Sequence, residues 1–397
     1  MIAALGFGWV VHDRLGWIAI PPNAPFVSNV IDPYYSSSAQ AGAALLRRAH
    51  EELGLVGLSA AVSVDGKLVW TASVGWADIE RGRPMTPETI LRIGSTSKAV
   101  TATALARLVD AGIMKLDEPI STHLSELPND AWRSLTPRHL ASRTAGLPGY
   151  EENRDLWGLY QTIMLQRPFD DVRDTLDIFD DTDLLFEPGT AFHYSSFDVN
   201  LLGATLQAAA GKPFLALLDE QVFIPLGMRA SGGEGRIEDA SRIATFYETR
   251  TSRARPWRKV DLSQKWPSGG LLSTSADLTL LCGGWFDSGF LDPQTVQVFW
   301  EPQRLASGEV NGQNYAIGWR SDRDSEALGA EHRTDRVHHG GVSKGAMSWL
   351  VCYPQYKLGI ALNINSKLEE FHWLADREPP IAKAFVDALL NMRPATE

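Results

Sequence analysis

The sequence predicts an α/β (α+β) fold in which both ends of the chain build one antiparallel sheet with flanking helices, and a mostly helical domain is inserted between them. Two observations lead to this fold class. Strand-like runs occur near both ends of the 397-residue chain, whereas residues 115–265 show helical stretches, Pro and Gly punctuation and little alternation. We therefore expect an α/β part over residues 37–94 and 266–397, a helical part over 95–265, and an apolar arm over 1–36.

The arm contains two apolar runs, Ile2–Val11 and Leu15–Ile20. The first has too few residues to span a bilayer, which takes about 20, and no basic stretch precedes it as in a signal peptide. Two interpretations stay open. The arm packs on the protein or on a partner, or it is the remnant of an export signal or membrane anchor. The second favours a periplasmic, extracytoplasmic or membrane-associated location over the cytoplasm.

The first elements after the arm are a helix and a hairpin. Ala39–Leu53 has leucines at helical spacing, and Gly54 is a typical helix-ending residue. The Asp65-Gly66 pair stands between the β-rich runs Leu58–Val64 and Lys67–Val74, which indicates a hairpin. We expect this hairpin to share a sheet with the chain's C-terminal strands.

Further elements follow the same logic along the chain. Ala-rich and Leu-rich stretches predict helices over Ala99–Val109 and Val199–Ala210, each followed by a glycine. Strand-like runs return at Ser348–Tyr353 and Leu358–Ile364, joined by four residues. The latter two are expected to pair near the early hairpin and to complete the sheet.

Charge and cysteine content exclude several classes of protein. The chain has 48 acidic and 37 basic residues, a net charge of −11, which is opposite to that of a nucleic-acid binder. Its two cysteines, Cys282 and Cys352, are too few for a cysteine-rich metal site; they could pair once, but we expect two separate core thiols. A local basic run is interpreted as a solvated loop, with an acidic partner or lipid headgroups as the alternative contact; it consists of Arg250, Arg253, Arg255, Arg258 and Lys259.

The candidate nucleophile is Ser95, in the tetrad Ser95-Thr96-Ser97-Lys98. This is the single Ser-x-x-Lys in the chain, and it stands between Gly94 and a predicted helix. Three residues are just under one helical turn, so the serine hydroxyl and the lysine amine share a face. A desolvated Lys98 could take the proton of Ser95, whose oxyanion would gain from the helix N-terminus. The alternative is an N-cap serine followed by an exposed lysine.

Other polar residues are weaker candidates on their own. Tyr194 precedes a helix and could point a phenol into a cleft, although a structural tyrosine is the more common case. His338 and His339 precede a strand-like segment, and adjacent histidines in a strand would point to opposite faces and bind one metal ion poorly. With no His-Glu-x-x-His motif either, we expect no metal and no cofactor.

One motif is a decoy. Gly341-Val342-Ser343-Lys344-Gly345 matches the nucleophile elbow Gly-x-Ser-x-Gly of α/β-hydrolases. That fold needs an acid and then a histidine downstream, but the remaining chain is too short for the required strands and helices, and repeated βα units are missing before it. We therefore do not expect Ser343 to be the nucleophile.

Three motifs in order give the chain a family resemblance. Ser95-x-x-Lys98, Tyr194-x-Ser196 and His338-x-Gly340 resemble the Ser-x-x-Lys, Tyr-x-Asn and Lys/His-x-Gly motifs of the serine β-lactamase and penicillin-binding-protein superfamily. The segment Leu140–Gly149 (LASRTAGLPG) is similar to the family's LLSHTSGLPG. The chain most resembles the mitochondrial β-lactamase-like serine proteases and their bacterial relatives, over residues 43–365.

The resemblance implies a serine hydrolase that forms an acyl-enzyme on an amide, peptide or ester substrate, which is a small molecule or a peptide. Lys98 would act as base or keep Tyr194 ionised, and Tyr194 would relay a proton to the leaving group. The N–H groups of Ser95 and Gly341 would form the oxyanion hole, and Gly340 would let substrate approach. The alternatives are a carboxylesterase of the same fold and a non-catalytic sensor or scaffold.

Two positions depart from the family pattern. Ser196 stands where penicillin-recognising members usually carry asparagine, and a hydroxyl offers fewer hydrogen bonds than an amide. His338 stands where classical β-lactamases carry lysine, and an imidazole is mostly neutral at neutral pH. Both changes predict weak β-lactam hydrolysis and favour the peptidase and esterase branches.

Overall fold

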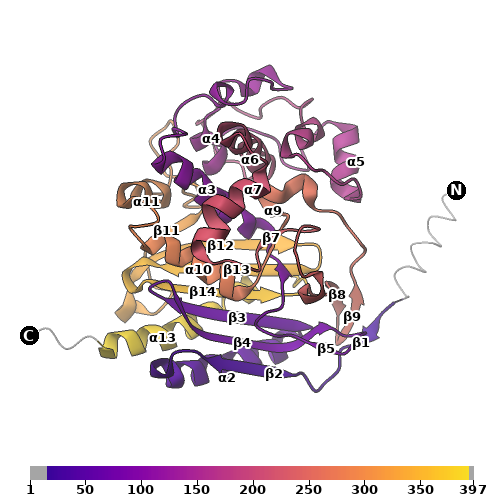
Figure 1. Ribbon diagram of the computed structural model, residues 1–397, viewed down its shortest axis with the longest axis vertical. Helices are drawn as coiled ribbons and strands as arrows, with labels where there is room; N and C mark the ends of the chain where they lie inside the picture. Colours follow the sequence, from indigo (N-terminus) through magenta and orange to yellow (C-terminus); the bar gives the residue numbers. More distant parts are fainter. Residues whose placement is uncertain (1–15, 393–397) are drawn as a thin grey trace, which may run out of the picture.

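The computed structural model describes residues 16–392 and confirms the predicted fold class (Figure 1). Its main sheet has eight antiparallel strands in the order β11-β12-β13-β14-β3-β4-β2, with β5 paired to β4. Strand β14 pairs with β3 from Leu358↔Val64 to Ile364↔Leu58, which joins the two chain ends as expected. The strands are β2 (Phe26–Val30), β3 (Gly57–Val64), β4 (Lys67–Asp78), β5 (Arg83–Pro84), β11 (Arg320–Ser325), β12 (Thr334–Ser343), β13 (Ala346–Tyr353) and β14 (Leu358–Ile364).

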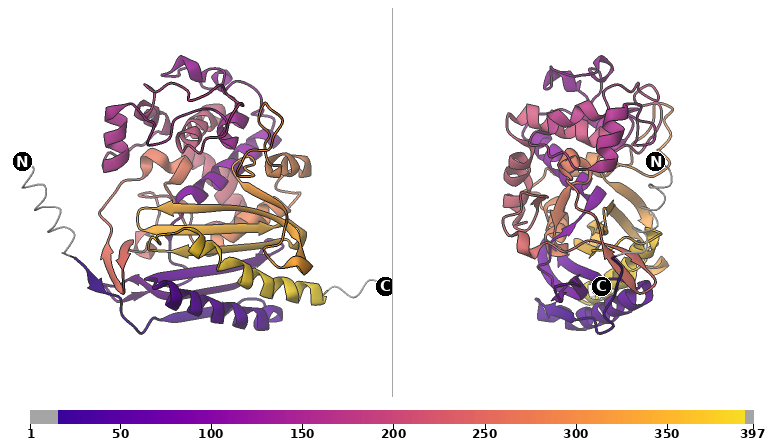
Figure 2. Two further views of the ribbon diagram at one scale, coloured as in Figure 1. Left: turned by 180° about the vertical axis from the view of Figure 1, so that it is seen from behind. Right: turned by 90° about the vertical axis from the view of Figure 1, so that its right-hand side faces the viewer.

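Helices cover both faces of this sheet (Figure 2). α2 (Ser36–Leu53) and α13 (Glu378–Met392) pack together on one face, with Leu46, Ala49 and Phe385 in a shared core. α10 (Ser275–Phe286) lies on the other face, against β3 and β14. α2 ends at Gly54, whose φ of 59° is the left-handed conformation that glycine adopts without strain. The sheet thus has helices on both faces and supports the residues of β12 near its β11 edge.

The helical part lies above the sheet in Figure 1. Its helices are α3 (Ser97–Asp110), α4 (Pro137–Ser142), α5 (Leu156–Met164), α6 (Phe197–Ala210), α7 (Phe214–Leu218) and α8 (Ile224–Leu226), followed by α9 (Trp266–Gly269) and α11 (Pro293–Trp300), while α12 (His372–Ala375) precedes α13. Within residues 16–392 no single helix is long and apolar enough to cross a membrane, and one bent pair, Phe197–Ala210 with Phe214–Leu226, passes that test by length and composition.

Several strands carry no clear signal in the sequence. β2 lies within the predicted arm yet forms the edge of the main sheet beside β4. The basic run contains β9 (Arg253–Pro256), which pairs with β8 (Tyr247–Arg250) and with β1 (Ile18–Ala19). A third small sheet joins β6 (Leu91–Arg92), β10 (Leu271–Ser273) and β7 (Gly232–Gly233). The first apolar run of the arm, Ile2–Val11, lies outside the described residues.

The expectation of two separate thiols is wrong, because Cys282 and Cys352 form a disulfide. It links α10 to β13, two elements that pack face to face in the fold but lie 70 residues apart in the sequence. Gly359 is the partner of Cys352 in the ladder, and a β-carbon there would lie 2.9 Å from that of Cys282. The glycine thus leaves the space through which the helix cysteine reaches the sheet.

Loss of this disulfide is expected to destabilise the protein. By the chain-entropy model, a cross-link that closes a loop of this length stabilises the folded state by about 4 kcal/mol. Urea unfolding of Cys282→Ala/Cys352→Ala should show a lower free energy of unfolding than the oxidised wild type, and reductant should lower only the wild type. Equal midpoints for oxidised and reduced wild type would contradict this expectation.

Candidate active site

Ser95 lies in a tight turn, Gly94–Thr96, that leads directly into α3. Gly94 has a φ of +50°, and a β-carbon at this position would lie 2.6 Å from the carbonyl oxygen of Val342 in β12. Only glycine lets the turn approach the strand so closely. The local backbone therefore places the Ser95 hydroxyl between the start of α3 and the edge of the main sheet.

Lys98 is buried beneath Ser95, with 1% of its surface exposed. Its Nζ lies 2.9 Å from Ser95 Oγ, 3.3 Å from Ser196 Oγ and 2.5 Å from the carbonyl oxygen of Ser268. Burial lowers its pKa well below the usual value, and the positive charges of Arg143, Lys265 and Arg320 lower it further. The structure thus places an amine of low basicity next to the candidate nucleophile.

Tyr194 stands on the other side of Ser95, just before α6. Burial raises its pKa to about 12, although the charge of Arg143 and a hydrogen bond with Ser95 act in the opposite direction. The Lys98 amine and two guanidinium groups surround its ring within 5.3–5.4 Å of the centroid, measured to Lys98 Nζ, Arg143 Cζ and Arg320 Cζ. A phenol with this pKa is neutral at physiological pH.

The two adjacent histidines point to opposite sides of β12, as the sequence predicts. His338 lines the cleft, and its Nε2 lies 3.1 Å from Asp322 Oδ2. Burial lowers the His338 pKa to about 4 despite this carboxylate, so the imidazole is neutral at physiological pH. His339 is buried on the other side, where its Nε2 lies 3.0 Å from the hydroxyl of Tyr315.

Tyr194 packs against a buried network of charged and aromatic side chains that the sequence does not indicate. Arg143 is fully buried, donates from Nη2 to the Tyr315 hydroxyl at 3.0 Å, and lies 3.9 Å from a carboxylate oxygen of Asp198. The Tyr315 ring in turn contacts the Tyr194 ring edge to face, with centroids 6.0 Å apart. The one available signal was Arg143 itself, which replaces a histidine within LASRTAGLPG.

Two glycines of β12 bring its backbone to the turn of Ser95. β11 pairs with β12 only as far as His338, so beyond that residue this edge of β12 meets the turn, while its other edge stays paired with β13. A β-carbon on Gly341 would lie 1.9 Å from the carbonyl oxygen of Ile93 and 2.9 Å from the amide nitrogen of Ser95. On Gly340 it would strike the ring of Phe371, at 2.2 Å.

The predicted residues meet in a cleft of about 570 Å³ between the main sheet and the helical part. One side is polar and the other is apolar, and the apolar side comes mainly from the C-terminal segment around α12. The lining residues are Ser95, Tyr194, Arg320, His338, Gly340, Val342, Trp349, Phe371, His372 and Ala375. Ser196 reaches the same site through Lys98. Arg320 and Phe371 were not among the predicted residues, because nothing in their local sequence marks them.

The decoy motif forms a different structure from the one that a nucleophile elbow requires. Ser343 ends β12 and pairs with Ala346 at the start of β13, so the segment is a hairpin and no helix follows. Its side chain is buried and does not line the cleft.

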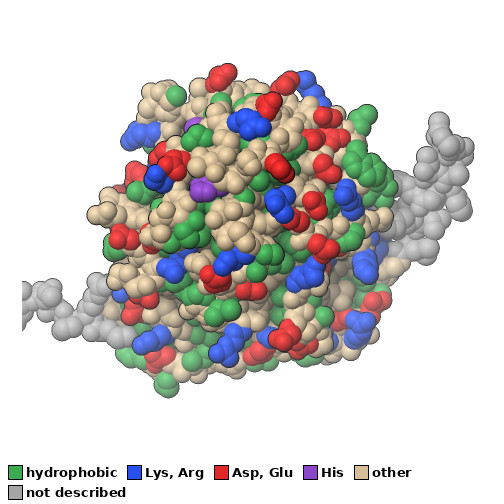
Figure 3. Space-filling view, turned by 45° about the horizontal axis from the view of Figure 1, so that its top comes forward, with side chains coloured by type: hydrophobic (Ala, Val, Ile, Leu, Met, Phe, Trp, Pro, Cys, Tyr) green, Lys and Arg blue, Asp and Glu red, His purple; other side chains and the backbone are tan. Residues whose placement is uncertain are grey.

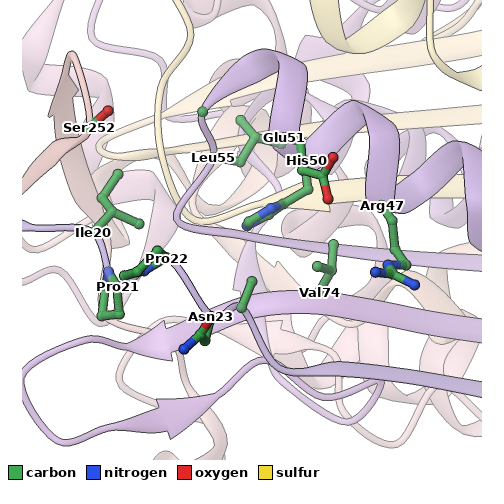
Figure 4. Close-up of a pocket in the computed structure, with 12 residues that line it drawn as sticks. Ile20, Pro21, Pro22, Asn23, Arg47, His50, Glu51, Leu55, Val74 and Ser252 are labelled. Atoms are coloured by element: carbon green, nitrogen blue, oxygen red, sulfur yellow. The ribbon is translucent and has the colours of Figure 1, made fainter.

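A second cavity, of about 630 Å³, lies at the far edge of the sheet (Figure 4). The N-terminal residues Pro21, Pro22 and Asn23 form one side, and α2 contributes Arg47 and His50. Among the residues that line this cavity there is no serine–lysine pair. The cleft at Ser95 is therefore the candidate active site.

This site defines the class of serine hydrolases with the transpeptidase fold. It has a Ser-x-x-Lys pair at a helix start, a tyrosine opposite that pair and a sheet edge beside both. The Beta-lactamase family model matches residues 43–378, and the chain belongs to that family. The serine β-lactamase-like protein LACTB, mitochondrial, of Homo sapiens is 28% identical over 390 residues, covering 78% of this chain and 71% of that protein. Esterase EstB of Burkholderia gladioli is 29% identical over 341 residues, covering 78% and 86%.

Solved structures share the fold at lower sequence identity. The D-amino acid amidase of Ochrobactrum anthropi SV3 superposes with a TM-score of 0.72 at 22% identity, covering 90% of this chain and 100% of its own. The octameric penicillin-binding protein homologue of Pyrococcus abyssi gives a TM-score of 0.70 at 22% identity, covering 90% and 78%. These similarities confirm the predicted family and architecture.

Proposed function

We propose that the protein is a serine hydrolase that cleaves an amide, peptide or ester through an acyl-enzyme on Ser95. The observation that supports this function best is the 2.9 Å approach of the Lys98 amine, whose pKa is depressed by burial, to the Ser95 hydroxyl. A neutral amine there can accept the serine proton as the oxygen attacks the carbonyl carbon. Labelling with a fluorophosphonate, followed by intact-mass spectrometry and an ester and amide panel, tests the proposal.

The hydrogen bonds of Lys98 fit the role of general base. A neutral amine has two N–H bonds, which can be donated to the Ser268 carbonyl and to Ser196 Oγ, and its lone pair then faces Ser95. Tyr194 has a raised pKa and is a poor base, so we assign it the opposite role, that of protonating the leaving group. The proton would reach the leaving group from Lys98 through the phenol.

The oxyanion that forms on the attacked carbonyl needs hydrogen-bond donors. The Ser95 amide nitrogen lies at the start of α3, and the β12 backbone at Gly341 approaches it closely. We assign the N–H groups of these two residues to the oxyanion hole, where each donor is worth about 3 kcal/mol in the transition state.

Arg320 gives this site a preference for anionic substrates. Its hydrogen-bond partner is the uncharged amide oxygen of Gln313, at 2.7 Å, so that contact leaves its charge unneutralised. The same charge also lowers the pKa values of Lys98, Tyr194 and His338, in agreement with a position beside the reacting groups. The apolar wall of Trp349, Phe371 and Ala375 would hold the hydrocarbon part of the substrate.

Removal of the Arg320 charge should affect charged and uncharged esters differently. For Arg320→Gln we expect kcat/KM on p-nitrophenyl hemisuccinate to fall by about tenfold, the scale of one charged hydrogen bond, with p-nitrophenyl butyrate changed much less. The two esters have the same acyl length and differ in the carboxylate. An equal loss on both would mean that Arg320 supports the cleft without selecting the substrate.

Hydrolysis of β-lactams is expected to be poor. His338 is neutral, and Ser196 offers one hydroxyl that already bonds Lys98, so two contacts that usually hold a penicillin are weakened. Each is worth about 1–3 kcal/mol, which implies a loss of about two to four orders of magnitude if the effects add. We expect Ser196→Asn/His338→Lys to raise kcat/KM on nitrocefin relative to p-nitrophenyl butyrate. Nitrocefin turnover near the diffusion limit in the wild type would contradict this interpretation.

The disulfide bears on the cellular location. Buried disulfides persist in oxidising compartments and are rare in a reducing cytosol. The Cys282–Cys352 pair therefore supports the periplasmic or extracytoplasmic location that the sequence favours.

A further inference from the structure

Helix α5 carries its large apolar side chains on the outside of the protein. With 3.6 residues per turn, these side chains fall within one arc of about 120° on the helix surface. An ordinary surface helix has the reverse arrangement, with apolar residues towards the core. The outward residues and their exposed fractions are Leu156 (82%), Trp157 (55%), Tyr160 (50%) and Ile163 (58%), whereas Gly158 and Gln161 are buried against the protein.

Contacts at three points fix α5 in this orientation. A β-carbon on Gly158 would lie 1.7 Å from the carbonyl oxygen of Ile178, so a larger residue cannot take its place against the protein. The Asp155 carboxylate caps the helix start by accepting hydrogen bonds from the N–H groups of Trp157 and Gly158. At the other end, Arg258 donates to the carbonyls of Ile163 and Met164, each at 2.6 Å. The helix cannot roll its apolar face inward.

Basic residues lie at the C-terminal end of α5, and the chain leads from there to the strands beside the N-terminal strand. Arg258 and its exposed neighbour Lys259 follow β9, the strand that pairs with β1. β1 begins shortly after the sequence run Ile2–Val11, which consists of apolar residues and glycine. Figure 1 shows α5 at the upper right of the molecule and β9 and β1 below it on the same side, and Figure 3 shows hydrophobic side chains at the right-hand rim.

We propose that the exposed face of α5 docks on the surface of a lipid bilayer that contains anionic lipids. Leucine, isoleucine, tryptophan and tyrosine on one helix face form the apolar side of an interfacial helix, and the stacked rings of Trp157 and Tyr160 suit the headgroup boundary. Arg258 and Lys259 supply positive charge at the C-terminal end of α5, although the whole protein is acidic. The acidic residues Glu151 and Glu152 precede the other end, so the basic end should lie nearer the headgroups.

The experiment is flotation of the full chain with vesicles of phosphatidylcholine and phosphatidylglycerol in a two-to-one ratio. We expect the wild type to float and Trp157→Glu/Ile163→Glu to lose about tenfold or more of the vesicle-bound fraction. Arg258→Gln/Lys259→Gln should weaken binding to these vesicles more than binding to pure phosphatidylcholine. Ile224→Glu is the matched control, because Ile224 is 75% exposed on α8 and should bind as the wild type does.

Ester hydrolysis by each variant checks that the fold is intact, since α5 contributes no residue to the lining of the cleft. Equal flotation of Trp157→Glu/Ile163→Glu and the wild type would overturn the proposal, because binding would then come from another part of the chain. Failure of the wild type to float would overturn it as well. If sedimentation instead shows a dimer that Ile163→Glu disperses, with no vesicle binding, the face belongs to a second copy of the chain and the proposal is wrong.

Discussion

Ser95→Ala is expected to lower kcat by about 10⁴-fold or more on any ester or amide that the protein turns over. The reason is that the variant has no group left to form the acyl-enzyme, and loss of a serine nucleophile costs this much or more in hydrolases of other folds. The same change should abolish the mass increase that a fluorophosphonate produces on the intact protein. Both measurements are made on variants whose urea unfolding matches the wild type.

Ser343→Ala is the matched control, because Ser343 belongs to the other serine motif of the chain and lies outside the cleft lining. It should be labelled and should turn over substrate as the wild type does. Labelling that survives in Ser95→Ala and disappears in Ser343→Ala would overturn the assignment of the site. Labelling of neither variant would point to a third serine, which peptide mapping of the labelled wild type would locate.

The sequence predicts the parts of this protein whose signals are local. The Asp65-Gly66 hairpin, the glycine that ends α2 and the Ser-x-x-Lys tetrad each depend on residues within one turn or a few positions, and the structure has each of them. The bounds of β12 were not predicted, because its sequence, TDRVHHGGVS, lacks the alternation of a half-buried strand. Its glycines serve the approach of the backbone to Ser95 rather than the packing of a sheet face.

The residues that tune the site were not predicted, because their effect depends on distant contacts. Arg143 lies at the end of α4, whereas Tyr315 and Arg320 belong to one segment at the start of β11, and the two segments meet only in the folded chain. The disulfide was missed for the same reason, since Gly359 makes room for it only in the ladder with Cys352. Burial, which lowers the Lys98 pKa, is likewise a property of the folded chain and not of the tetrad.

The pKa values in the cleft predict which side of the pH profile depends on Lys98. The Lys98 amine must be neutral to accept a proton. Activity should therefore fall as the pH drops below its depressed pKa, and should be full at pH values above that pKa. Tyr194, with a pKa of about 12, and His338, with a pKa of about 4, keep one protonation state across the neutral range. The acidic limb of kcat/KM should therefore report Lys98.

Lys98→Ala is expected to lower kcat by about a hundredfold or more, the scale of losing a positioned base, and to remove that acidic limb. Lys98→Arg is the discriminating partner, because a guanidinium keeps the positive charge and cannot act as a base near neutral pH. If Lys98 takes the serine proton, both variants should be similarly impaired. If the charge of Lys98 instead held Tyr194 as a phenolate, Lys98→Arg would retain much of the activity, and the roles assigned to the two residues would have to be exchanged. A Lys98→Ala variant within a few-fold of the wild type would exclude both roles.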